Sequence, residues 1–197
     1  MAMRKFGLWV LMLAMVCSAF AQTAADQEQA RRADEILGKM RTMELTNQIL
    51  PLLLTKEQLR ELLPPIEKAR QAVKAAKAEE FSVLKMYEGK LDTAIKNATE
   101  KGQIPGREML LEMNRVLTAL GMKRRAIADE NIATVLAAAQ KLLNAGQLKA
   151  AANSLDPKLF DPTLKVEEMK EIDKVRFFVG EVMLDPLAYD ILVKLSR

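Results

Sequence analysis

The sequence contains no histidine and a single cysteine, Cys17, among its 197 residues. Histidine is the commonest general base and the commonest transition-metal ligand near neutral pH, so its absence argues against most acid–base and metal chemistry. One cysteine cannot form a disulfide within the chain. Glycine and aromatic residues are also scarce, and no glycine-rich loop suited to phosphate is present. We therefore predict a protein with no bound cofactor and no metal site.

The remaining candidates for catalysis are weak. Three pairs of adjacent carboxylates occur, but neighbours along a helix point about 100° apart and do not converge on one substrate atom. The serines have no histidine to act as a base. Met109 and Met113 have the spacing of a thioether copper site, although packing in a helical core explains the same spacing. We predict no catalytic residues and no enzymatic activity. The acidic pairs are Glu79-Glu80, Asp129-Glu130 and Glu167-Glu168, and the serines after residue 21 are Ser82, Ser154 and Ser196.

The N-terminus has the three parts of a secretory signal peptide. Arg4 and Lys5 precede an apolar run over 6–20, and Ala19 and Ala21 are small residues where a signal peptidase reads the chain. The run is shorter than the ~20 residues of a membrane-spanning helix, although an uncleaved anchor is the alternative. Cys17 follows Val16 rather than a small residue, which argues against a lipoprotein. We predict a signal peptide at 1–21, a periplasmic or other extracytoplasmic location, and no stable membrane insertion after cleavage.

Helix-forming residues dominate the rest of the chain, and no alternating strand pattern appears, so we predict an all-α fold. Apolar residues recur at three- and four-residue steps over about 26–49, 55–101, 107–143 and 165–184. The turn at 101–106 should fold the second and third helices back as a long antiparallel hairpin. Pro64-Pro65 predicts a kink or a division of the second helix. Flanking and extra C-terminal helices complete the prediction.

Two short segments share a helix-start pattern. Thr55 can accept from the backbone N–H of Gln58, and Gln58 can reach back to Thr55, which is a capping box, while Leu54 precedes the cap as in a hydrophobic staple. In the second segment the same roles fall to Leu143, Asn144 and Gln147. A single capping box is typical of an ordinary helix start. Two copies on either side of a long hairpin are more specific.

On these residues the chain resembles the LTxxQ-motif periplasmic proteins of the Spy/CpxP type. Leu54, Thr55 and Gln58 match the first motif, and Leu143 and Gln147 match the second, with Asn144 in the threonine position. The resemblance covers about residues 26–152. It implies a thin, curved cradle formed by an antiparallel homodimer, and either an ATP-independent chaperone activity or a role in envelope-stress signalling. The corresponding domains are 22–153 for the hairpin and 154–197 for a C-terminal helical extension.

Two functions follow from these features. An envelope chaperone would bind unfolded or partner proteins through Met109 and Met113 and through the basic run Lys123, Arg124 and Arg125. Core packing of the methionines and a solvated basic face are the alternatives. A structural or regulatory interaction protein would bury the same apolar stripe against a partner. The formal charge of +4 falls to +2 without Arg4 and Lys5, so the charge does not call for a nucleic-acid partner and we predict none.

Overall fold

The computed structural model describes residues 24–197, and the predicted signal peptide lies outside this range. Every regular element over 24–197 is a helix, and this confirms the all-α prediction. The chain divides between Arg41 and Thr42 into two units. Helix α2 (Ala24–Ile49) belongs to the first unit up to Arg41. The longer unit, Thr42–Arg197, contains every other helix.

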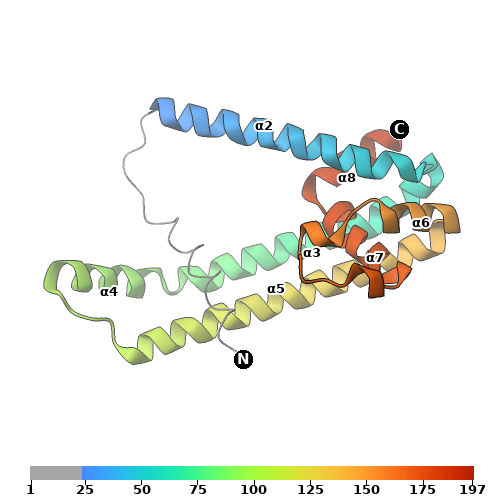
Figure 1. The fold of residues 1–197 in the computed structure, drawn as a ribbon. Coiled ribbons are helices and arrows are strands. Elements are labelled where there is room, and N and C mark those ends of the chain that lie inside the picture. The colour runs from blue at the N-terminus through green and yellow to red at the C-terminus, as the bar shows by residue number, and fades with distance from the viewer. Residues whose placement is uncertain (1–23) are drawn as a thin grey trace. The chain divides into compact units, whose positions relative to one another are not determined.

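The longer unit is built on a helical hairpin (Figure 1). Helices α3 (Lys56–Lys85) and α4 (Glu88–Lys101) run outward, and α5 (Arg107–Leu142) returns beside them. Glu80 contacts Arg124 while Lys90 contacts Glu112, so residue numbers rise on one arm as they fall on the other, and the arms are antiparallel. Gly102 closes α4 at φ 64°, a left-handed conformation that glycine adopts without strain. The cradle of two chains remains a prediction.

The outward arm over 55–101 is divided, but not at Pro64-Pro65, where a kink or a division was predicted. Pro64 and Pro65 lie inside α3, which is continuous through them. Each proline removes a backbone hydrogen bond and costs about 3 kcal/mol in a helix interior, so packing must hold this segment. Leu62 and Ile66 on either side are almost fully buried. The arm breaks instead at Met86 and Tyr87, where no neighbouring side chain is buried to hold a regular helix.

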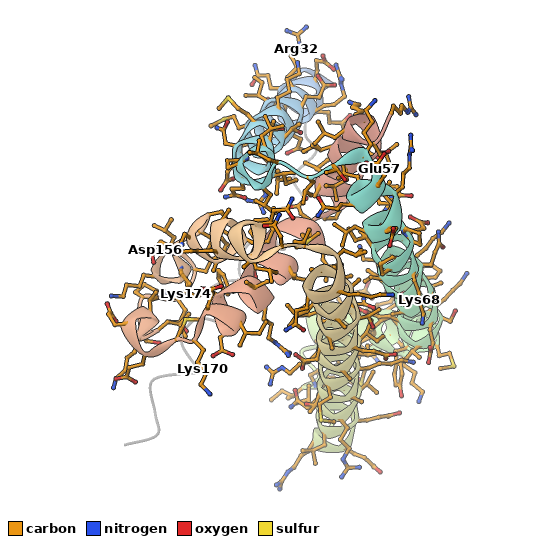
Figure 2. The ribbon with its side chains drawn as sticks, turned by 90° about the vertical axis from the view of Figure 1, so that its right-hand side faces the viewer. Arg32, Glu57, Lys68, Asp156, Lys170 and Lys174 are labelled. Carbon is orange, nitrogen blue, oxygen red and sulfur yellow. The ribbon has the colours of Figure 1, made fainter. Side chains whose placement is uncertain are left out.

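The C-terminal segments are short. Helix α6 (Ala145–Asn153) is followed by η3 (Pro157–Leu159), η4 (Val166–Glu168), α7 (Glu171–Phe178), the π-helical turn η5 (Val179–Met183) and α8 (Pro186–Leu195). Of the helix predicted over about 165–184, the part from Glu171 to Met183 is present as α7 and η5, whereas its predicted start is the separate short turn η4. Asp185 caps α8 by accepting from the backbone N–H of Leu187 at 2.9 Å. Figure 2 shows Asp156, Lys170 and Lys174 around the connection from α6 to α7, whereas Lys68 lies on α3.

These C-terminal helices form the core together with the base of the hairpin. Helix α8 packs on α3, α7 packs on α6, and η5 packs on α5. Lys56 Nζ also donates to the carbonyl of Arg197 at 2.7 Å. The predicted boundary between 153 and 154 therefore does not separate two packed parts, because one core is shared across it. Fully buried members of this core are Leu45, Leu62, Val135, Val179, Val182 and Ala188.

Candidate functional site

The two predicted motifs form capping boxes at the base of the hairpin. The side chain of Thr55 accepts from the backbone N–H of Gln58 at 3.2 Å, and the backbone N–H of Thr55 donates to Gln58 Oε1 at 2.9 Å. At the start of α6, Asn144 accepts from the N–H of Gln147 at 2.9 Å, and its own N–H donates to Gln147 Oε1 at 3.0 Å. Asn144 therefore performs the capping role of the threonine that the family pattern has there.

The two boxes are also joined to each other. Gln58 Nε2 donates to Gln147 Oε1 at 2.8 Å, and Gln147 Nε2 donates back to Gln58 Oε1 at 2.9 Å. Each amide then donates to the chain just before the other box: Gln58 to the carbonyl of Leu142 at 2.9 Å and Gln147 to that of Leu53 at 3.3 Å. Each glutamine thus uses both donors and accepts twice, and the arrangement has an approximate two-fold symmetry.

Leu54 and Leu143, the first residues of the two motifs, face the core. Leu143 is buried, and Leu54 packs against the buried cluster while half-exposed. Leu53 just before has φ 47°, a left-handed conformation that is rare for a residue with a branched side chain. Its carbonyl is the acceptor for Gln147, so this backbone conformation is held by the joined boxes. The motif residues are consequently structural, and they fix how α3, α5 and α6 meet.

The basic run on α5 is largely neutralised by the acidic pair on α3. Lys123 Nζ lies 2.5 Å from Glu79, and Arg124 binds both oxygens of Glu80, with Nε at 2.8 Å. The bond from Arg124 lowers the pKa of Glu80, and Glu80 raises the pKa of Arg124. Arg125 is exposed and forms no ion pair with the described residues. Glu79-Glu80 on α3 and Lys123-Arg124 on α5 lie at the same level of the antiparallel hairpin, so the two acids meet the two bases.

Met109 and Met113 lie on α5 near the turn of the hairpin and are both half-buried. Met109 lines a hollow of about 710 Å³ between α4, the turn and α5, together with Gly89, Asn97 and Glu112. Half-burial fits both alternatives for these methionines, since each side chain contacts the hairpin and keeps part of its surface open. No group of His, Cys, Asp and Glu among residues 24–197 has a geometry that would hold a metal ion.

An apolar groove, which sequence reasoning did not find, runs along the hairpin on one side. Its inner part has a volume of about 440 Å³ and lies between α3, α5 and the π-helical turn, and its outer part of about 530 Å³ continues towards Leu84. Val73, Lys77 and Ala128 line both parts, so we call the whole the hairpin groove. Its other apolar lining residues include Ala69, Ile132 and Leu184 in the inner part and Phe81, Leu84 and Ile127 in the outer part.

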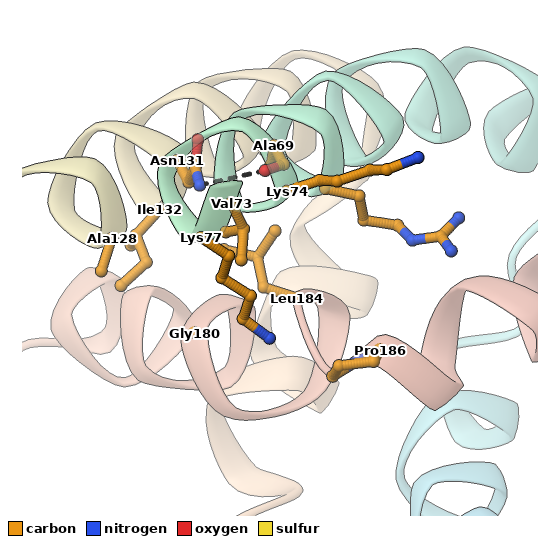
Figure 3. A pocket seen from close by; sticks show the side chains of 11 residues that line it. Ala69, Val73, Lys74, Lys77, Ala128, Asn131, Ile132, Gly180, Leu184 and Pro186 are labelled. Atoms are coloured by element: carbon orange, nitrogen blue, oxygen red, sulfur yellow. Dashed lines mark hydrogen bonds between the residues drawn. The ribbon is translucent and has the colours of Figure 1, made fainter. Parts of the chain in front are cut away.

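The inner part of the hairpin groove is shown in Figure 3. Asn131 is the buried polar residue of its lining, and its Nδ2 donates to the carbonyl of Ala69 at 3.3 Å across the hairpin. Gly180 in the π-helical turn approaches α5 so closely that a Cβ atom there would lie 3.2 Å from Ile132 Cδ1. The inner part of the groove is therefore formed by the hairpin and the C-terminal turn together. Only the folded chain brings these two segments side by side.

Comparisons of the chain with protein-family models, with curated proteins and with solved structures gave no match. The likeness to the LTxxQ-motif proteins therefore stays a prediction from the motif residues. Over residues 24–197, no helix combines the length and the apolar character that crossing a membrane requires.

Proposed function

We propose that this chain is an exported, ATP-independent, chaperone-like binding protein of the cell envelope that holds partly unfolded proteins on the outer half of its hairpin. The proposal includes membership of the LTxxQ-motif family, the cleaved signal peptide and the extracytoplasmic location predicted from the sequence. The observation that carries it is the large amount of exposed apolar side chain on the outer half of the hairpin, residues 70–130, where very few side chains are buried.

The outer half of the hairpin buries very little. Between residues 70 and 130, Leu120 is the one buried apolar side chain, and α4 has no buried residue. Apolar side chains are nevertheless frequent there and stand open to solvent. We call the following set the distal surface: Met86, Ile95, Ile104, Leu110, Leu111, Leu117 and Met122. Large exposed apolar surfaces on a soluble chain commonly mark sites of protein interaction.

The chemistry of the distal surface suits clients without a fixed shape. Met86 is 70% exposed and Met122 is 65% exposed, and the unbranched, polarisable methionine side chain adapts to irregular apolar partners. Arg125, next to this surface, is the member of the basic run with no ion pair among the described residues. Lys123 and Arg124 are already engaged by Glu79 and Glu80, so we assign them a smaller share in attracting acidic clients.

The test is suppression of aggregation of a chemically unfolded client, without ATP and at a stoichiometric ratio, by the protein purified after export. The double variant Leu110→Gln, Leu117→Gln should lose most of the activity while keeping its helical content, since neither residue is buried. Asn114→Gln, Thr118→Gln is the matched control, because both positions are exposed on the same helix. Wild-type protein that is folded and gives no protection at any ratio would refute the proposal.

The second candidate is a structural or regulatory interaction protein of the envelope, and the pairing of the basic run supports it. Because Glu79 and Glu80 neutralise Lys123 and Arg124, few free positive charges remain to attract acidic clients to the distal surface. An apolar surface with little free charge suits a permanent protein interface. A second copy of the chain, as in the predicted homodimer, would cover it. Sedimentation equilibrium decides between the two: a dimer that dissociates in the Leu110→Gln, Leu117→Gln variant, in a protein without protective activity, would favour the second candidate.

A further inference from the structure

We propose that the hairpin groove binds a long-chain fatty acid, with the acyl chain along its apolar floor and the carboxylate among the cations of its inner part. The site is separate from the distal surface, since none of the seven residues of that surface lines the groove. It therefore stands or falls independently of the proposed chaperone function.

The size of the groove fits one extended chain. Its two parts, of about 440 and 530 Å³, are each in the range of about 300–1,000 Å³ typical of small-molecule sites. Along α3 its lining runs from Ala69 to Leu84, which at ~1.5 Å per residue is about 22 Å. Val73, which is 41% exposed, and Phe81, which is 65% exposed, would lose much of their contact with water on binding such a chain.

The charges of the inner part are of one sign. Arg70, Lys74 and Lys77 line it, and no carboxylate does. Arg70 is held by Glu67 at 2.9 Å and lies 4.0 Å over the ring of Tyr189, whereas Lys74 and Lys77 form no ion pair or hydrogen bond with the described residues. Lys77 reaches across the groove towards Gly180 (Figure 3). Arg124 binds both oxygens of Glu80 in the outer part, and the hydrogen bond and charge of Arg124 and, to a smaller extent, the charge of Lys77 lower the pKa of this carboxyl. An anionic group at this end would therefore meet Lys74, which forms no ion pair with the described residues, and Lys77, which shares the charge of Glu80 with Arg124.

The walls select an acyl chain over a peptide. Helices α3 and α5 use their backbone N–H and C=O groups within the helices, and the amide of Asn131 already bonds Ala69. An extended peptide in the groove would find no backbone partners on its apolar floor and could satisfy its own backbone groups only with water on the open side. An acyl chain has no such groups. The π-helical turn closes the inner end with Gly180 and Leu184, a local irregularity of the kind that recurs at binding sites.

The test is equilibrium dialysis of the exported protein with labelled palmitate below its micellar concentration. We expect saturable binding of one palmitate per chain, and little binding of octanoate or of cetyltrimethylammonium, which lack the chain length and the negative charge respectively. Ala128→Phe places a ring where the two parts of the groove meet and should weaken binding by at least about tenfold. Ala126→Phe is its matched control, since Ala126 is exposed on the same helix outside the groove.

A charge reversal separates the head from the chain. Lys74→Glu, Lys77→Glu should weaken palmitate binding by about tenfold, whereas Lys68→Glu, Lys96→Glu makes the same change in charge outside the groove and should have little effect. When palmitate is added to the wild-type protein, the largest NMR chemical-shift changes should occur at Val73, Ala128 and Ile132. This measurement tests the location of the site even if a variant fails to fold.

Three outcomes overturn the proposal. Palmitate binding that Ala128→Phe leaves unchanged would put the ligand elsewhere. Equal binding of cetyltrimethylammonium would mean non-specific uptake of detergent-like molecules. The third outcome is binding of an acidic amphipathic peptide or of anionic vesicles that Ala128→Phe blocks and palmitate does not displace. That result would assign the groove to a protein partner or to a membrane surface. Suppression of client aggregation is expected to be the same in the Ala128→Phe variant as in wild type.

Discussion

Gln58 and Gln147 exchange two amide hydrogen bonds, of 2.8 and 2.9 Å, across the base of the hairpin. Each glutamine also closes the capping box of its own helix. The start of α3 and the start of α6 are thereby fixed to each other by the same side chains that cap them. A change at one glutamine therefore removes a cap and at the same time leaves the polar groups of the other box without partners.

We predict strong coupling between these two residues. Gln58→Ala and Gln147→Ala should each lower the free energy of unfolding by about 1–3 kcal/mol, because each leaves partly buried donors and acceptors unpaired. The double variant should lose clearly less than the sum of the two single losses. Urea unfolding of the four proteins measures the cycle, with Gln140→Ala on the exposed side of α5 as control. Additive losses would mean that the two boxes act separately.

We predict that Asn144 contributes to stability through its capping hydrogen bond, which other capping residues can also provide. Asn144→Ala should cost about 1 kcal/mol of unfolding free energy, since the N–H of Gln147 loses its acceptor. Asn144→Thr, which restores the residue of the first motif, should stay within a few tenths of wild type, because threonine caps helices nearly as well. Urea denaturation checks both variants. A threonine variant as unstable as the alanine variant would show that the amide of Asn144 has a role beyond capping.

The ion pair between Glu80 and Arg124 should make stability depend on pH. Its hydrogen bond lowers the pKa of Glu80 below the ordinary value of 4.5, so the folded state favours the ionised carboxylate. The stabilisation is complete above that ordinary value and is lost as the pH falls through the lowered pKa of the folded state. Between neutral pH and about pH 3, the free energy of unfolding should fall less in the Glu80→Gln variant than in wild type, as measured by urea unfolding at each pH. Parallel losses in the two proteins would mean that the pair contributes nothing measurable.

The C-terminal helices should be indispensable for folding. A chain ending at Asn153 lacks Phe178, Val179 and Val182, each of them buried, and burial of one such side chain stabilises by about 1.5–3 kcal/mol. We expect the shortened protein to unfold without a cooperative transition, as followed by circular dichroism on heating. Deleting only Arg197, which offers its carbonyl to Lys56 at the surface, is the control and should shift the midpoint little. Cooperative unfolding of the shortened chain would restore the boundary predicted at 153.

Several local features were readable from the sequence because they depend on neighbours along the chain. The capping residues Thr55 and Asn144 and the turn at 101–106 have the predicted geometry. The break at Met86 was missed, and of the two alternatives predicted at Pro64-Pro65 the division of the helix is wrong, since both features depend on whether the segment has packing partners. The hairpin groove was also missed, because its lining comes from four separate helical elements, α3, α5, η5 and α8.

The sequence by itself determined the helical class, where most helices begin, and that two long arms fold back on each other, because these follow from periodicity, caps and turn residues. The tertiary structure decided that Gln58 meets Gln147, that Glu79 and Glu80 neutralise part of the basic run, and that the last helices complete the core at the base of the hairpin. The physical reason is that contacts between distant segments depend on which faces are buried together. The local sequence pattern determines which face of each helix is apolar. Only the packing of the whole chain determines which other helix that face contacts.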